Sequence, residues 1–121
     1  MSRPAKIIID LAAIQANCRL AQSIAPHSKT VAVVKADAYG HGAVEVTKAL
    51  ASQVEMFTVS CLEEALVLRE DNVRKPILLL EGCFDKAELN VAADKQFELV
   101  VHSRLQLEQL INATFETPIN I

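Results

Sequence analysis

The hydrophobic residues of this chain follow two patterns that alternate along its length. Short, mostly apolar runs are typical of strands in a parallel sheet, and they occupy residues 30–35, 56–60, 77–80 and 97–101. The run V-A-V-V at residues 31–34 suits a strand that is buried on both faces. A further β-like run lies at residues 5–9, and residues 118–121 begin what the pattern predicts to be another strand. Between the runs, apolar residues recur at helical spacing, which indicates amphipathic helices.

Most of the predicted helices carry a start signal. Asp10 is a candidate N-cap for a helix whose apolar face extends to Ile24, and Pro26 ends that helix. A second helix is predicted from about residue 43 to 51, after a loop over residues 37–42. Three more begin at polar pairs with capping-box spacing, which are Ser60 with Glu63, Asp85 with Glu88, and Ser103 with Gln106.

This alternation predicts the α/β class, with right-handed βαβ units on a parallel sheet. The element order alone leaves both a doubly wound sheet and a barrel open. A Rossmann sheet favours a G-x-G-x-x-G turn after its first strand, whereas residues 35–42 read K-A-D-A-Y-G-H-G. A TIM (β/α)8 barrel needs about 250 residues. The 121 residues present are therefore expected to be a fragment with about the first half of such a barrel.

Composition indicates which kinds of partner the protein binds and in which cellular compartment it is found. The net charge is −3 and Lys and Arg form no cluster, which argues against nucleic acid. Three widely spaced cysteines indicate reduced core thiols rather than a disulfide framework or a zinc site. No segment approaches the roughly 18 apolar residues of a membrane span, and no signal peptide precedes Asp10. We therefore expect a cytoplasmic protein with no nucleic-acid or membrane partner.

Lys35 is the first candidate for chemistry, because it directly follows the apolar run V-A-V-V. Active sites of parallel α/β folds lie at the carboxyl ends of strands. A lysine there can pair with a buried carboxylate, bind a phosphate, act as a base or form a Schiff base. Burial favours the last two because it disfavours the ammonium form. The pattern supports a structural salt bridge and a functional role equally.

The loop after Lys35 favours the functional role. Tyr39 is the only tyrosine, and it stands with Gly40 and Gly42 before a predicted helix. The N–H groups at that helix start, together with the tyrosine hydroxyl, would suit a phosphate. The alternative is an aromatic side chain packed over the end of the sheet. His41 is more typical of a hydrogen-bonding loop residue than of a metal ligand, and no metal site is predicted.

Three acidic residues near these elements have explanations other than catalysis. Asp37 follows a strand, where an acidic residue caps a loop as readily as it catalyses. Glu63 and Glu64 lie in the first turn of a predicted helix, where capping and solvation suffice. We assign none of the three to the site.

The segment A-V-V-K-A-D-A-Y-G-H-G at residues 32–42 resembles the pyridoxal-phosphate attachment motif of the alanine racemases. The resemblance extends along the chain, to I-D-L-A-A-I-Q-A-N at residues 9–17, S-C-L-E-E-A-L at residues 60–66 and K-P-I-L-L-L-E-G at residues 75–82. It implies that residues 1–121 are the N-terminal part of that family's cofactor-binding barrel domain. The remainder of the barrel and a C-terminal β-domain would then be absent.

The resemblance also implies a site and a reaction. In this family the lysine matching Lys35 holds pyridoxal 5′-phosphate covalently, and it then becomes the catalytic base that moves the α-proton on the D-alanine side. The tyrosine matching Tyr39 contacts the cofactor phosphate. The implied reaction interconverts L-alanine and D-alanine, which supplies D-alanine for cell wall synthesis. The implied protein is a cytoplasmic homodimer with alanine as its small-molecule partner.

Racemisation by this family uses a second base, a tyrosine from the C-terminal domain that reaches across the dimer interface. The chain has one tyrosine, and it matches the phosphate contact, so the 121 residues alone are expected to be inactive. Selectivity between alanine and serine stays open. Two other classes also stay open, which are a non-catalytic barrel protein that binds pyridoxal phosphate and a ligand-free fragment that self-associates through exposed strand edges.

Overall fold

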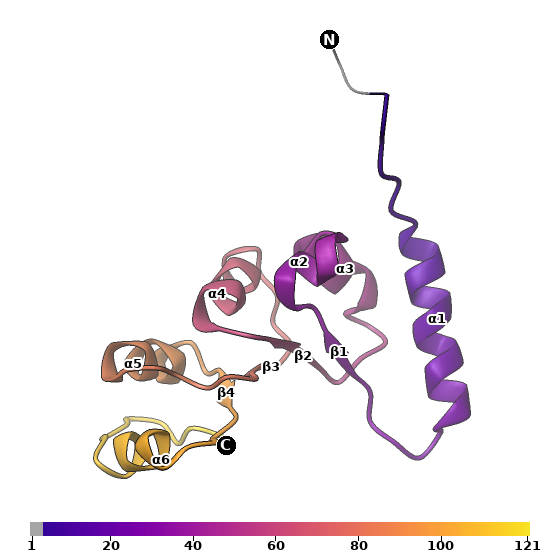
Figure 1. Ribbon diagram of the computed structural model, residues 1–121. Helices are drawn as coiled ribbons and strands as arrows, with labels where there is room; N and C mark the ends of the chain where they lie inside the picture. Colours follow the sequence, from indigo (N-terminus) through magenta and orange to yellow (C-terminus); the bar gives the residue numbers. More distant parts are fainter. Residues whose placement is uncertain (1–3) are drawn as a thin grey trace.

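Four parallel strands form one sheet in the computed structural model, which describes residues 4–121 (Figure 1). The strands are β1 (Val31–Val33), β2 (Met56–Val59), β3 (Ile77–Leu79) and β4 (Glu98–Leu99). The helices are α1 (Leu11–Ile24), α2 (Lys35–Gly40), α3 (Ala43–Leu50), α4 (Leu62–Glu70), α5 (Lys86–Asp94) and α6 (Arg104–Ile111). The α/β class and the four central strands are therefore confirmed, although each strand is shorter than predicted.

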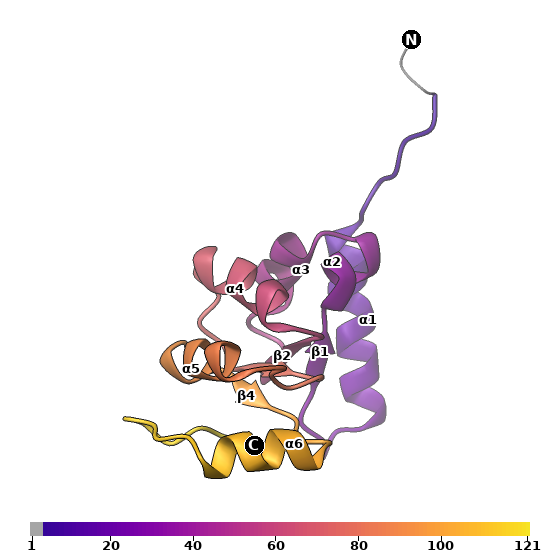
Figure 2. The same ribbon diagram turned by 60° about the vertical axis from the view of Figure 1, so that its left-hand side comes forward.

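The strand order distinguishes a barrel from a doubly wound sheet. Each strand pairs in parallel with the next along the chain, so that Ala32 lies opposite Phe57 and Val59 opposite Leu79. In a doubly wound sheet the order of the strands reverses at a switch point, whereas here each strand lies beside the next one in sequence, from β1 to β4. Right-handed crossovers that always advance the same way leave the helices on one face. Figures 1 and 2 show α4, α5 and α6 in succession along the same side of the strands.

The face of the sheet that the helices cover carries the hydrophobic core. Its strand residues are at most 2% exposed, and they are Phe57, Val59, Ile77, Leu79 and Leu99. They belong to one cluster with buried residues of the helices, namely Val46, Leu50, Leu62, Ala65, Leu68, Leu89 and Ala92. Each large side chain buried in this way contributes about 1.5–3 kcal/mol. This layer therefore fixes the relative positions of the strand ends.

The opposite face of β1 is open to solvent. Val31 and Val33 share that face and are 44% and 43% exposed, whereas Val34 is 2% exposed. The prediction that this strand is buried on both faces is therefore wrong for the described residues. In a complete barrel this face lines the interior, where inward side chains of all the strands pack together. Four strands do not close that interior.

Both terminal strand predictions are wrong. Residues 5–9 belong to no strand, and Ile7 and Ile8 are 85% and 76% exposed. Figures 1 and 2 show this segment leading away from the sheet. An apolar run becomes a strand only where a neighbouring strand takes up its hydrogen bonds. Residues 118–121 also form no strand, although the Leu99 N–H donates to the Asn120 carbonyl at 3.1 Å.

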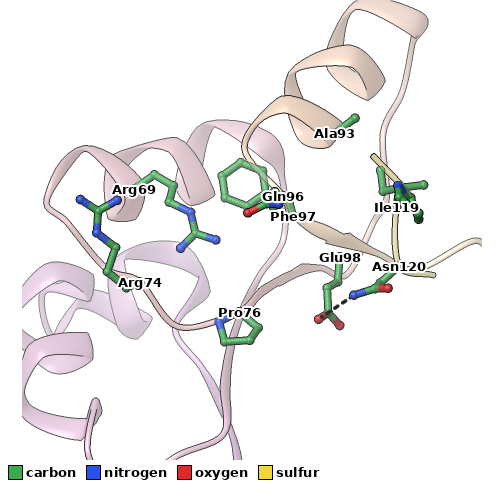
Figure 3. A pocket seen from close by; sticks show the side chains of 10 residues that line it. Arg69, Arg74, Pro76, Ala93, Gln96, Phe97, Glu98, Ile119 and Asn120 are labelled. Carbon is green, nitrogen blue, oxygen red and sulfur yellow. Dashed lines mark hydrogen bonds between the residues drawn. The ribbon is translucent and has the colours of Figure 1, made fainter. Parts of the chain in front are cut away.

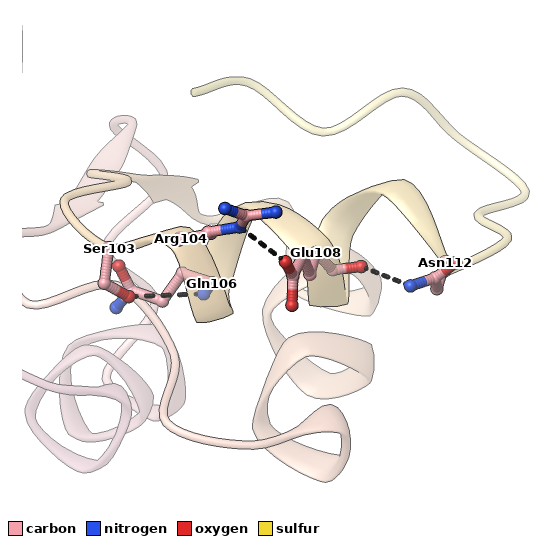
Figure 4. Close-up of polar contacts among 5 residues, drawn as sticks. All are labelled: Ser103, Arg104, Gln106, Glu108 and Asn112. Atoms are coloured by element: carbon pink, nitrogen blue, oxygen red, sulfur yellow. Dashed lines mark hydrogen bonds and ion pairs between the residues drawn. The ribbon is translucent and has the colours of Figure 1, made fainter.

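Three of the predicted helix starts are confirmed. The Asp10 carboxylate accepts from the Ala13 N–H at 3.0 Å, and α1 follows. Asp85 accepts from the N–H of Glu88 at 2.9 Å at the start of α5. Ser103 accepts from the N–H of Gln106 at 3.2 Å at the start of α6 (Figure 4). These caps satisfy N–H groups that have no partner within the helix.

The predicted pairing of Ser60 with Glu63 is wrong. Helix α4 begins at Leu62, so Cys61 is its N-cap and Glu64 is its third residue. The side chain that reaches back is Glu64, which accepts from the Ser60 N–H at 2.8 Å. The spacing in the sequence could not distinguish the two neighbouring glutamates, because either would satisfy a capping box if the helix began one residue earlier or later.

Candidate functional site

Lys35 lies at the carboxyl edge of the sheet, directly after β1. The preceding residue, Val34, still donates its N–H to the Thr58 carbonyl of β2 at 2.9 Å. Val34 is buried and Lys35 is half-buried, so the alternation of the strand continues into the lysine. The ion pairs found among residues 4–121 are Lys48–Asp71, Lys95–Asp94 and Arg104–Glu108. The structural salt bridge that the sequence left open is thus not formed by Lys35 in this part of the chain.

The residues after Lys35 form a left-handed turn. Ala36, Asp37, Ala38 and Tyr39 have φ between 51° and 56° and ψ between 37° and 49°. This backbone costs a residue other than glycine about 1–2 kcal/mol. Such strain persists only where the surrounding structure holds it, and it concentrates at functional sites. The predicted loop is therefore a strained turn, α2, that connects Lys35 to Tyr39.

Hydrogen bonds within the turn help to stabilise this strained backbone. The Ala38 N–H donates to the Val34 carbonyl at 2.9 Å, and His41 Nδ1 lies 2.9 Å from the Ala38 carbonyl. The Asp37 carboxylate accepts from the Ala43 N–H at 2.7 Å, at the start of α3. Asp37 and His41 therefore have the structural roles considered for them. Because the first N–H of α3 already binds a carboxylate, a phosphate predicted at this helix start would depend on other groups.

Tyr39 lies near the end of the turn, and 60% of it is exposed. The alternative in which this ring packs over the end of the sheet is therefore wrong. None of the hydrogen bonds found among residues 4–121 uses its hydroxyl, which leaves that group available to a ligand. The structure thus brings Lys35 and Tyr39 together on one turn, with both side chains accessible from solvent.

Glu64 is a functional candidate that the sequence pattern did not select. Its carboxylate accepts from the Ser60 N–H at 2.8 Å and from the Ala36 N–H at 2.7 Å. It therefore joins the end of β2 to the first residue of the strained turn. The pattern explained this glutamate by capping and solvation alone. Its place in the first turn of a helix at the carboxyl edge was a signal, but the fold was needed to see which neighbour it reaches.

The thiols do not contribute reactive groups at this edge. Burial raises the pKa of the Cys83 thiol from 9.0 to about 11, with a smaller contribution from Glu88 and Asp85. Burial also raises the pKa of Cys61. Neutral thiols are poor nucleophiles and poor metal ligands.

Within residues 4–121, no cluster of three His, Cys, Asp or Glu side chains could hold a metal ion, and no helix is long and apolar enough to cross a membrane.

A cavity of about 300 Å³ lies at the opposite edge of the sheet, near the first residues of β3 and β4 (Figure 3). Arg69 and Arg74 line it. The Arg69 guanidinium donates to the carbonyls of Val73 and Lys75, and it lies 5.2 Å from the centre of the Phe97 ring. Burial, and to a lesser extent Arg74, lowers the pKa of Arg69. These contacts explain Arg69 as a residue that holds the connection from α4 to β3.

The groups at the carboxyl edge fit a cofactor that carries an aldehyde and a phosphate. A Schiff base needs a lysine amine that the aldehyde can reach. Lys35 provides such an amine, because its side chain is half-exposed and forms no ion pair with the described residues. The exposed Tyr39 hydroxyl lies on the same turn and would offer a hydrogen-bond donor to a phosphate. Pyridoxal 5′-phosphate has both groups.

Comparisons with known proteins identify the family of this chain. The family described as "Alanine racemase, N-terminal domain" matches residues 9–121. The chain belongs to the alanine racemase family. The catabolic alanine racemase of Pseudomonas aeruginosa is 48% identical over 119 residues, which are 98% of this chain and 33% of that protein. The alanine racemase of Chromohalobacter salexigens is 51% identical over 111 residues, which are 92% and 30% of the two chains.

Solved alanine racemase structures have the same fold over the matched region. The biosynthetic alanine racemase of Pseudomonas aeruginosa superposes with a TM-score of 0.87 at 44% identity, over 93% of this chain and 31% of that one. The alanine racemase of Acinetobacter baumannii gives a TM-score of 0.82 at 42% identity, over 85% and 29%. The chain spans about a third of the length of the curated alanine racemases it matches. Its fold is part of the TIM barrel of that family, as predicted.

Proposed function

We propose that residues 1–121 are the part of an alanine racemase barrel domain that holds pyridoxal 5′-phosphate, with Lys35 as the catalytic residue. One observation carries this proposal: the half-exposed Lys35 follows β1 at the carboxyl edge of a parallel sheet, on a strained turn, in a chain of the alanine racemase family. When bound, the cofactor delocalises the negative charge left on the substrate after its α-proton is removed.

Lys35 and Tyr39 would have different roles in the reaction. The Lys35 amine would hold the cofactor, and, when free, its Nζ would remove the α-proton of D-alanine in one direction of the reaction and donate a proton to that same face in the other direction. The Tyr39 hydroxyl donates to the phosphate and so orients the cofactor relative to Lys35. Both residues belong to one turn, so a single backbone segment sets the distance between the anchor and the phosphate.

Racemisation needs a second proton carrier, on the opposite face of the substrate. The chain has a single tyrosine, Tyr39, and it is already assigned to the phosphate. We therefore assign the second carrier to the C-terminal β-domain of the complete enzyme, reached across a homodimer interface. The complete enzyme would interconvert L-alanine and D-alanine in the cytoplasm and supply D-alanine for cell wall synthesis. The 121 residues alone would not racemise.

A chiral assay with L-alanine tests this proposal. The 121-residue chain loaded with pyridoxal phosphate should form no D-alanine above the rate without protein. A chimera in which the same residues are joined to the remaining sequence of the Pseudomonas aeruginosa catabolic racemase should form it. A parallel assay with serine measures side-chain selectivity.

Two results would contradict the proposal. Production of D-alanine by the 121-residue chain would show that the second proton carrier is not missing. A folded chimera that binds the cofactor but racemises neither alanine nor serine would exclude a racemase and favour a non-catalytic cofactor-binding barrel.

A further inference from the structure

We propose that Glu64 is a positioning residue for Lys35, an inference that rests on the proposed role of Lys35 as the cofactor anchor. The Glu64 carboxylate binds two backbone N–H groups that belong to different βα units, Ala36 after β1 and Ser60 after β2. It thereby fixes the backbone next to Lys35 to the neighbouring strand end.

The starts of α4, α5 and α6 show why this glutamate has a second role. In each helix, the side chain of the third residue accepts a hydrogen bond from the backbone N–H of the residue before the N-cap. The distance is 2.8 Å for Glu64, 2.8 Å for Glu88 and 3.0 Å for Gln106. This bond uses one side-chain oxygen. The other polar atom at the end of the Glu64 side chain is a second oxygen, which accepts from the Ala36 N–H. The remaining atom of Gln106 is a nitrogen, which donates to the Glu81 carbonyl at 2.7 Å.

The chemical type of each side chain matches the neighbour it reaches. Gln106 contacts a carbonyl, so it needs a donor as its second atom. Glu64 contacts an N–H, so it needs an acceptor there. A glutamine at position 64 could keep the capping bond through its oxygen, as Gln106 does. Its amide group would then face the Ala36 N–H donor to donor, and that one bond would be lost.

The bond to Ala36 acts on Lys35 through the peptide that the two residues share. The Ala36 N–H belongs to the peptide plane on the carboxyl side of Lys35, and Glu64 holds it at 2.7 Å. The plane on the amino side contains the Val34 carbonyl, which accepts from the Ala38 N–H at 2.9 Å. With both planes held, the direction in which the lysine side chain leaves the backbone is fixed. Loss of either bond would release one of them.

Packing does not replace these hydrogen bonds. A cavity of about 150 Å³ lies beside the Glu64 side chain, with Val59 and Val67 among its lining residues. The side chain therefore has room to move, and its two charged hydrogen bonds determine its place. Because glutamine has nearly the same shape as glutamate, Glu64→Gln tests the acceptor without opening or filling the cavity.

The experiment compares Glu64→Gln with Glu88→Gln in the full 121-residue chain. Glu88 is the matched control, because it occupies the same helix position in α5 and makes the same capping bond after β3, away from Lys35. The first measurement is hydrogen exchange of the Ala36 amide by NMR. The second is the yield of pyridoxal phosphate fixed on Lys35 by borohydride, located by mass spectrometry.

A hydrogen bond to a charged group contributes enough that its loss should speed Ala36 exchange at least about tenfold in Glu64→Gln. The labelling of Lys35 should fall in the same variant, and Glu88→Gln should match the wild-type chain in both measurements. Unchanged Ala36 exchange in Glu64→Gln, or equal labelling in the two variants, would overturn the proposal. If the wild-type chain takes no label, the proposed function fails, and Ala36 exchange alone decides whether Glu64 holds the turn.

Discussion

Replacing Lys35 by arginine is expected to abolish racemisation in the chimera with the Pseudomonas aeruginosa sequence. Arginine keeps the positive charge and the length of the side chain, but its guanidinium neither loses its proton nor attaches the cofactor. A positioned base alone contributes about 10²–10⁴-fold to the rate. We therefore expect kcat/KM for both enantiomers of alanine to fall at least about a hundredfold, measured by chiral chromatography.

The matched control is Lys29→Arg. Lys29 is an exposed lysine shortly before β1, so the same chemical change there should leave both rates within about twofold, as for most surface substitutions. If Lys35→Arg folds and keeps rates similar to those of this control, Lys35 is neither the anchor nor the base. Activity lost equally in both variants would indicate damage to the fold instead.

Gly82→Ala is expected to cause the largest loss of stability at the carboxyl edge. Gly82 has φ +68°, and an added Cβ would lie 2.5 Å from the Val100 carbonyl oxygen and 2.8 Å from Gln106 Nε2. The left-handed backbone costs alanine about 1–2 kcal/mol. Displacing Gln106 also breaks its bond to the Glu81 carbonyl, and a buried polar group left without a partner costs about 1–3 kcal/mol more. Urea unfolding measures the total.

Gly40→Ala separates the steric cost from the backbone cost. Gly40 has φ +82°, but an added Cβ would have no neighbour within 4 Å. Its substitution should cost only the backbone contribution of about 1–2 kcal/mol. Equal losses in the two variants would show that the loop around Gly82 rearranges freely and that Gln106 does not hold it.

The core of the fold was predictable from the sequence because its signals are local. Mostly apolar runs mark β1 to β4, and Asp10, Asp85 and Ser103 mark helix starts that the structure confirms. The terminal runs at residues 5–9 and 118–121 carry the same local signal but form no strand. A strand depends on a partner elsewhere in the chain, and local pattern does not show whether one is present.

The candidate site was predictable in part. A lysine at the end of a buried run, followed by the only tyrosine, pointed to residues 35–39, and the structure places both on one accessible turn. The left-handed backbone of that turn was not predictable, because Ala36, Asp37, Ala38 and Tyr39 do not favour it. Glu64 was missed because its second contact, at Ala36, lies 28 positions away in sequence.

The position at which pyridoxal phosphate attaches tests the central claim most directly. The 121-residue chain is incubated with the cofactor, reduced with borohydride, digested and mapped by mass spectrometry. The predicted result is one cofactor per chain, on the peptide that contains Lys35, and no cofactor on that peptide in Lys35→Arg. Label spread over exposed lysines such as Lys29, with no preference for Lys35, would contradict the claim that this strand end holds the cofactor.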